Sequence, residues 1–213
     1  MPVEPDVEPL DPIETRVLGA LLEKESTTPE YYPLSLNALV NACNQKSNRH
    51  PVVSFDERTV LPAIESLRGK RFAAVVVGSG RVNKYAQRFS ETLNLGRREM
   101  ALLCALMLRG QQTLGELRDR SERMHNFADL EEVESCLQRL GEWESGPLAV
   151  KLLRQPGQKE ARYAHLLGGE IPTEELFEEV DRPPSGLEAE VARLREEVQE
   201  LQRQFADFRR QFE

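Results

Sequence analysis

The sequence predicts a mainly α-helical fold with small β-hairpins, because a pattern of three helices and one hairpin is written twice and a heptad repeat follows it. The apolar positions of the two copies superimpose at offsets of 85, 78 and 73 residues along the three helices. Each copy closes with a basic residue beside a tyrosine, at Lys84-Tyr85 and Arg162-Tyr163. Three helices followed by a hairpin are the layout of a winged helix-turn-helix domain. We therefore expect two such domains in tandem, followed by a C-terminal coiled-coil helix.

Composition divides the 213 residues into five segments. The beginning of the chain is acidic and rich in proline, a second acidic stretch follows the repeated pattern, and a regular apolar repeat follows that stretch. We expect a disordered acidic tail over residues 1–11, a first winged-helix domain over 12–92, a second over 93–168, an acidic linker over 169–185 and a coiled-coil helix over 186–213.

The helices of the first domain are predicted from apolar periodicity and capping residues. The first helix is expected over Pro12–Lys24, because proline suits the first turn and one apolar stripe follows it. Ser35 is a suitable N-cap for the second helix. Ser54 and Glu57 have the spacing of a capping box, which places the third helix near residues 55–69.

A proline and a hairpin complete the first domain. Pro62 lies inside the third helix and removes one backbone donor, so we expect a bend there. The strands Phe72–Val77 and Val82–Gln87 flank a short glycine-rich turn and are expected to form the wing.

The second domain repeats this order. Its first helix is expected over Gly96–Arg109, with apolar residues nearly all round, and should be buried on most sides. Thr113 and Glu116 cap the second helix, and Asp129 and Glu132 cap the third. The second hairpin is predicted over Leu148–Arg154 and Arg162–Leu167.

The C-terminal segment carries a heptad seam with apolar residues at alternating steps of four and three. Valine at the first core position and leucine at the second favour a parallel two-stranded coil, so we expect a homodimer. The alternative is that this helix folds back on its own chain. The predicted dimerisation residues are Leu187, Val191, Leu194, Val198, Leu201, Phe205, Phe208 and Phe212.

The sequence contains the strings Thr27-Thr28-Pro29-Glu30, Tyr32-Pro33-Leu34-Ser35, Ala42-Cys43-Asn44-Gln45-Lys46, Gln87-Arg88-Phe89, Leu108-Arg109-Gly110 and Gly115-Glu116-Leu117-Arg118. Together these strings resemble the YceH-type family of uncharacterised bacterial proteins over about residues 10–168. The resemblance implies a tandem winged-helix fold and implies no particular activity.

Positive charge is concentrated in one block of a chain whose net charge is −8. Residues 46–88 carry 9 basic and 3 acidic side chains, a net of +6, whereas residues 1–45 carry 2 basic and 8 acidic ones, a net of −6. The basic block covers the third helix and wing of the first domain, which are the parts that contact phosphates in a winged helix. The sequence therefore predicts a DNA-binding regulator or chromosome-associated factor that contacts duplex DNA through its first domain.

Asparagine and glutamine can pair with adenine, while lysine and arginine can pair with guanine or phosphate. On this basis the candidate DNA-binding residues are Asn44, Gln45, Lys46, Asn48, Arg49, Arg58, Thr59, Arg68, Lys70, Arg71, Arg81 and Lys84. The alternative interpretation is a solvated surface whose polar side chains cap local helix ends.

The second domain is expected to bind DNA less well, because its third helix carries Glu131, Glu132, Glu134 and Glu142. Phosphates repel such a face, so we expect it to bind a protein or to have a structural role. This favours a second hypothesis, a protein-interaction scaffold resembling the acidic tandem winged-helix accessory subunits of chromosome-condensing complexes.

No arrangement of residues in the sequence indicates an enzyme, a cofactor or a metal site. The cysteines lie far apart on apolar stripes, and neither a C-x-x-C motif nor a histidine pair at four-residue spacing occurs. The longest apolar run, Met100–Leu108, is far shorter than the roughly 20 residues that cross a bilayer, and the acidic N-terminus is unlike a secretory signal. We expect a non-enzymatic cytoplasmic protein with reduced cysteines and no membrane partner.

Overall fold

The computed structural model describes residues 8–77, 82–154 and 157–169, and all of them belong to one compact unit. The heptad segment, all but the first residue of the expected linker, and Arg81 lie outside the described residues. Of the expected tail over residues 1–11, residues 1–7 lie outside the described residues and residues 8–11 are described. Leu10 is buried in the core, and its N–H donates to the carbonyl of Leu167 at 2.7 Å.

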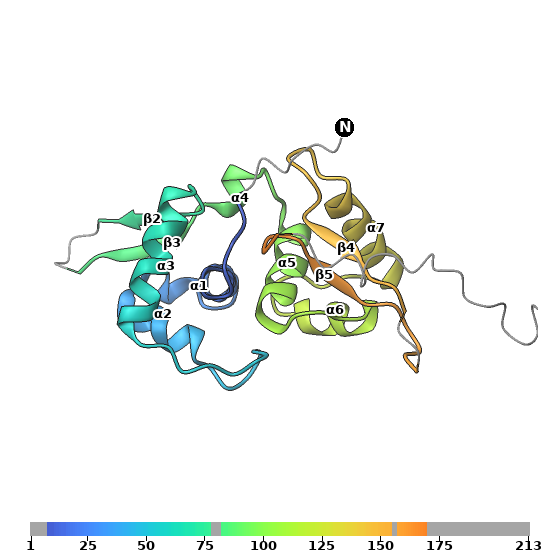
Figure 1. The fold of residues 1–213 in the computed structure, drawn as a ribbon, viewed down its shortest axis with the longest axis horizontal. Helices are drawn as coiled ribbons and strands as arrows, with labels where there is room; N and C mark the ends of the chain where they lie inside the picture. Colours follow the sequence, from blue (N-terminus) through green and yellow to red (C-terminus); the bar gives the residue numbers. More distant parts are fainter. Residues whose placement is uncertain (1–7, 78–81, 155–156, 170–213) are drawn as a thin grey trace, which may run out of the picture. The chain divides into compact units, whose positions relative to one another are not determined.

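The first repeat, residues 12–87, has three main helices and a three-stranded antiparallel sheet of strand order β1-β3-β2 (Figure 1). The short strand β1 was not predicted; it pairs Leu34 with Tyr85. The elements are α1 (Pro12–Thr27), η1 (Pro29–Tyr31), β1 (Leu34–Ser35), α2 (Leu36–Cys43), α3 (Glu57–Gly69), β2 (Ala73–Val76) and β3 (Lys84–Gln87).

Capping residues explain where these helices begin. Asp11 and Glu14 form a capping box that starts α1, and the Ser35 hydroxyl accepts from the backbone of α2, as expected. The prediction of Ser54 as the cap of α3 is wrong. The carboxylate of Asp56 accepts from the N–H of Thr59 instead, so α3 begins two residues after the predicted start.

The second repeat, residues 97–167, has the same order of helices and hairpin. Gln112 forms a two-way backbone bridge with Tyr163, with N–H to O distances of 3.0 and 2.7 Å. This bridge corresponds to the pairing of Leu34 with Tyr85, because both partners lie 78 residues further along the chain. The elements are α5 (Arg97–Arg109), α6 (Leu114–Ser121), α7 (Leu130–Gly141), β4 (Ala149–Lys151) and β5 (Tyr163–His165), and the short α4 (Phe89–Thr92) precedes them.

Helix α1 packs against α2 and α3 of its own repeat and against α5 of the second repeat, and Figure 1 shows it end-on between them. Every residue from Glu14 to Glu23 is therefore buried, although the sequence predicted one apolar stripe. The Cys104 thiol donates to the carbonyl of Gly19 at 3.4 Å, so the two helices approach closely where α1 has no side chain. The buried residues of both repeats form one continuous core.

The predicted fold class is confirmed as mainly helical with small antiparallel sheets. Thr113 with Glu116, and Asp129, cap α6 and α7 as expected. Helix α5 is buried continuously from Ala101 to Leu108, also as expected. Among the described helices, none is both long enough and apolar enough to cross a membrane.

Candidate functional site

The predicted DNA-contacting turn between the second and third helices is a loop over residues 44–56 that is tied to the rest of the protein. Arg16 of α1 donates to the carbonyls of Cys43 and Pro51 at 3.2 and 2.7 Å, which holds the start and the middle of the loop to α1. The N–H of His50 donates to the carbonyl of Leu108 at 2.8 Å. The loop therefore packs on α1 and on the end of α5.

Arg49 is the predicted DNA ligand whose environment differs most from the expected one. Its guanidinium is fully buried and donates to both carboxylate oxygens of Glu23, at 3.1 and 2.7 Å, and to the carbonyl of Ala42 at 2.9 and 3.2 Å. A buried arginine whose donors are occupied in this way holds the loop to α1 and is not exposed to a phosphate.

Other predicted DNA ligands also have partners inside the protein. Asn44 exchanges two hydrogen bonds with the backbone of Phe55, and Gln45 accepts from Lys24 at 3.1 Å. Asn48 accepts a short hydrogen bond from Arg109, and Lys70 forms an ion pair of 2.8 Å with Glu14. The remaining two with local partners are Thr59, bonded to Asp56, and Arg68, paired with Glu65.

Four of the predicted cations are exposed, and their side chains have no hydrogen-bond or ion-pair partner among the described residues. They come from the loop, the two ends of the α3 region and β3. These four, called the exposed cations below, are Lys46, Arg58, Arg71 and Lys84.

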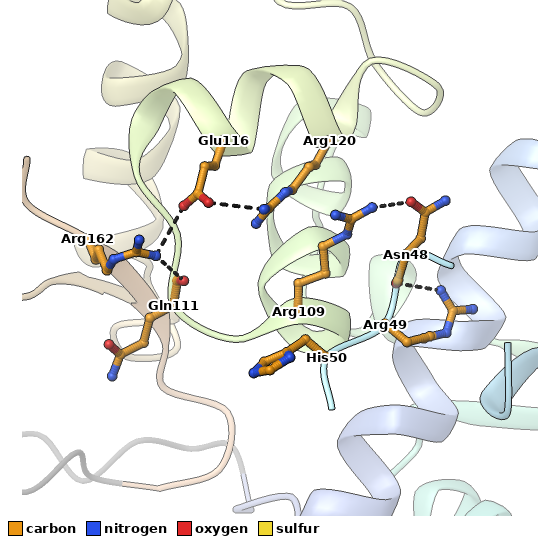
Figure 2. Close-up of a pocket in the computed structure, with 8 residues that line it drawn as sticks. All are labelled: Asn48, Arg49, His50, Arg109, Gln111, Glu116, Arg120 and Arg162. Atoms are coloured by element: carbon orange, nitrogen blue, oxygen red, sulfur yellow. Dashed lines mark hydrogen bonds and ion pairs between the residues drawn. The ribbon is translucent and has the colours of Figure 1, made fainter. Parts of the chain in front are cut away.

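The structure also contains a polar pocket of about 330 Å³ that the sequence did not reveal. Both repeats contribute to it: the loop provides one wall, and the end of α5, α6 and the residue before β5 provide the other (Figure 2). Its lining residues are Asn48, Arg49, His50, Arg109, Gln111, Glu116, Arg120 and Arg162.

A hydrogen-bond network orders the arginines of this pocket around one carboxylate. Glu116 accepts from Arg120 at 3.0 Å through one oxygen and from Arg162 at 3.1 Å through the other. Arg120 also donates to the buried amide of Gln112 at 2.9 Å, and Arg109 donates to Asn48. Figure 2 shows these side chains in a row, from Arg162 through Glu116, Arg120 and Arg109 to Asn48.

Positive charge exceeds negative charge in this pocket. Three arginines, Arg109, Arg120 and Arg162, share the single carboxylate of Glu116, which leaves a net charge of +2, while the charge of Arg49 is balanced by Glu23. Burial lowers the pKa of the Arg109 guanidinium, and the charge of Arg120 lowers it further. The arrangement therefore suits an anion.

Of the pocket's ion pairs, only that of Glu116 with Arg120 could be recognised in the sequence, and the pocket as a whole could not. Glu116 and Arg120 are four residues apart on one helix, a spacing that places them on one face. Arg162 and Asn48 are separated from them by 46 and 61 residues, counted from Glu116 and Arg109, so only the fold brings them in.

The described residues contain no group of three or more histidine, cysteine, aspartate or glutamate side chains that could hold a metal ion. All three cysteines are unpaired and buried. Burial raises the pKa of Cys43 and of Cys136 to about 12, and raises that of Cys104 as well. Thiols in this environment are poor nucleophiles and poor metal ligands, and they pack as core residues.

Comparison with known proteins places the chain among proteins of similar length and related sequence. A UPF0502 protein of Solibacter usitatus is 57% identical over 209 residues, which cover 96% of this chain and 98% of the relative. The UPF0502 protein YceH of Escherichia fergusonii is 48% identical over 194 residues, covering 88% and 90%. The family model described as "Protein of unknown function, DUF480" matches residues 10–158. The chain therefore belongs to the DUF480 family, together with the YceH-type proteins that its sequence resembles.

Proposed function

We propose that the chain is a tandem winged-helix protein that binds duplex DNA through its first repeat and acts as a regulator or chromosome-associated factor. The repeated order of helix, short strand or bridge, helix, helix and hairpin supports the winged-helix assignment. In such domains the third helix and the hairpin face the DNA, which here are α3 with β2 and β3.

One observation carries this proposal: the exposed cations Lys46, Arg58, Arg71 and Lys84 come from the third helix, the segments on either side of it and the hairpin of the first repeat, and their side chains have no acidic partner among the described residues. In the second repeat the corresponding helix, α7, exposes Glu131 and Glu134, and Glu142 follows it directly. Because phosphate neutralisation dominates affinity for DNA, the first repeat is the better DNA-binding surface.

Fluorescence anisotropy with duplex fragments of the native genome tests the proposal. With Arg68 added to the exposed cations, about five phosphate contacts are expected, which give a log–log salt slope of about −4 to −5. Saturable binding with this slope supports the proposal. No binding at micromolar protein in about 50 mM salt contradicts it.

Two double variants, one in each repeat, identify the surface that binds DNA. Replacing Arg58 and Lys84 by glutamine should lower the salt slope by about two and weaken binding by roughly tenfold or more at low salt. The matched control replaces Arg123 and Lys159, two exposed cations of the second repeat, and should leave the slope unchanged. Equal losses in both variants would contradict a site on the first repeat.

A second candidate function, the protein-interaction scaffold, is favoured by exposed apolar side chains on the same repeat. Leu61 of α3 is 40% exposed, and Val77 and Val82 of the hairpin are 83% and 64% exposed. Large apolar side chains that face solvent are typical of protein contacts. Co-purification from the native cell after nuclease treatment separates the two functions. A stoichiometric protein partner that survives this treatment favours the scaffold.

We also propose that the chain forms a homodimer through the heptad seam of residues 186–213, a proposal that depends on the sequence pattern alone. Light scattering with and without these residues tests it. The full chain should have twice the mass of the truncated one, after allowing for the residues removed. A mass of one chain in both samples means that residues 186–213 do not cause dimerisation.

The burial of all three unpaired cysteines supports a reducing compartment, and we propose the cytoplasm. Fractionation of the native cell, followed by detection of the protein in each fraction, tests this location. Recovery in a fraction other than the cytoplasm contradicts it.

A further inference from the structure

We propose that the pocket between the two repeats binds a small ligand that carries a phosphate monoester group. This inference does not depend on DNA binding, because the pocket and the exposed cations share no residue. It rests on the arginine cluster, its charge balance, the remaining donors and the size of the cavity.

The charge of the pocket matches a dianion. Arg109, Arg120 and Arg162 are opposed by Glu116 alone, so an anion with two negative charges would neutralise the site. A phosphate monoester carries about that charge at neutral pH. A phosphodiester of a nucleic-acid backbone carries one charge and would leave the site half neutralised.

The arginines of the pocket retain donors of the kind that bind phosphate. A guanidinium has five N–H donors in a planar fork. The contacts of Arg120 use one donor toward Gln112 and one toward Glu116, while Arg162 directs a single nitrogen at both of its partners. Each therefore retains N–H groups for a ligand, and planar forks suit the oxygens of phosphate better than point charges do.

Partial burial strengthens these interactions without closing the site. The side chains of Arg120 and Arg162 are 31% and 34% exposed, so a ligand can reach them, while water screens them less than it screens a surface arginine. Burial lowers the pKa of Arg109, and the charge of Arg120 lowers it further, so these two guanidinium groups repel each other. An anion would relieve the repulsion.

The size of the cavity selects a small ligand. About 330 Å³ is at the lower end of the range of small-molecule pockets, enough for a phosphate group with a substituent up to the size of a mononucleotide. Asn48 and His50 come from the first repeat, whereas the three arginines come from the second. A bound ligand would therefore contact both repeats and would stabilise the loop of residues 44–56 on the second repeat.

Isothermal titration calorimetry on the full-length protein in phosphate-free buffer tests the proposal. The probes are inorganic phosphate, glycerol phosphate and adenosine monophosphate, with adenosine as the uncharged control. At least one phosphate probe should bind saturably with one site per chain and a Kd below about 1 mM, and adenosine should not bind. No saturable binding of any phosphate probe up to about 10 mM would overturn the proposal.

Two substitutions should shift the affinity in opposite directions, which a general loss of folding would not do. Arg120→Gln removes one guanidinium group and should weaken phosphate binding about tenfold or more. Glu116→Gln removes the competing carboxylate, while glutamine retains the capping role at this position, so binding should tighten severalfold. The same sign in both variants would overturn the proposal.

Arg118→Gln is the matched control, since Arg118 lies on the same helix, is exposed and does not line the pocket. Its affinity for the phosphate probe should equal that of the parent protein. A short duplex without terminal phosphates distinguishes the source of the phosphate. If only the duplex binds, and Arg120→Gln abolishes that binding, the pocket is a nucleic-acid site and the small-ligand proposal is wrong.

Discussion

Glu23 on α1 and Arg49 in the loop of residues 44–56 form a buried ion pair in which Oε2 and Nη2 are 2.7 Å apart. Burial by itself would raise the pKa of Glu23, but the hydrogen bonds and charge of Arg49 outweigh it, so the pKa is lowered. The same guanidinium donates to the carbonyl of Ala42. One side chain thus holds the end of α2 and the following loop against α1.

Arg49→Met should destabilise the protein by about 3–5 kcal/mol, because it leaves the carboxylate of Glu23 buried without its partner. Urea unfolding followed by circular dichroism measures the change. The double variant Glu23→Gln with Arg49→Met removes the unpaired charge and should recover part of the loss. The exposed pair of Arg88 and Glu91 is the control, and Arg88→Met should cost less than about 1 kcal/mol. Similar costs at both sites would show that burial of the pair contributes nothing.

Gly19→Val should destabilise the packing of α1 on α5 by about 2–3 kcal/mol. A Cβ at this position would lie 2.9 Å from Leu108 Cδ2, 3.0 Å from its Cγ and 3.2 Å from Met107 Cβ, so the branched side chain has no room. Thermal unfolding measures the loss. Gly115→Ala is the control because its Cβ would meet nothing within 4 Å, and it should stabilise α6 slightly. An unchanged melting temperature in Gly19→Val would mean that the two helices can separate freely.

Tyr32→Phe should cost about 1–2 kcal/mol, because the Tyr32 hydroxyl accepts the backbone N–H of Gln87 at 2.5 Å and its loss leaves this donor without a partner. The neighbouring Tyr31 is 73% exposed and provides the matched control. Tyr31→Phe should leave the free energy of unfolding unchanged. Chemical denaturation of both variants decides the prediction, and equal values would contradict it.

Acidification should destabilise the protein through His165, which is half-buried and whose Nδ1 has no partner in the described part of the chain. Burial lowers its pKa from 6.5 to about 4. Between these values the unfolded chain binds a proton that the folded protein does not bind. The free energy of unfolding should therefore fall by about 1–3 kcal/mol as the pH falls from 6.5 to 4.

The variant His165→Leu cannot titrate and should show a smaller loss over the same pH range. His50→Gln is the control, since His50 is exposed and its replacement should preserve the loss seen in the parent protein. Urea unfolding at several pH values between 4 and 6.5 measures the free energy of unfolding of all three proteins. If the parent and His165→Leu lose stability equally, another group is responsible.

Local signals predicted the elements well where the partners lie within one turn of a helix. The carboxylate and hydroxyl caps at Ser35, Thr113 and Asp129 contact backbone groups three residues away, so sequence spacing was sufficient. Near the start of α3 the sequence offers two residues that could cap the helix, and Asp56 forms the cap instead of the predicted Ser54. Strand β1 is two residues long and depends on a partner strand far along the chain, so no local pattern could reveal it.

The candidate sites required contacts that no local pattern encodes. Of the predicted DNA ligands, Lys46 is exposed whereas Arg49, three residues later, is fully buried against Glu23. Both side chains carry one positive charge, so the sequence does not distinguish them. Their surroundings in the fold do. The polar pocket likewise depends on Arg109 and Arg162, which come from different ends of the second repeat.

The sequence by itself determined the repeated order of helices and hairpins, because apolar periodicity and capping depend on neighbours three or four residues away. Only the tertiary structure decided which polar side chains face solvent, since Glu23 and Arg49 meet across 26 residues and Glu116 and Arg162 across 46. Whether an arginine holds the core together or binds a ligand depends on the desolvation and partners that packing imposes, and these form only when distant parts of the chain pack together.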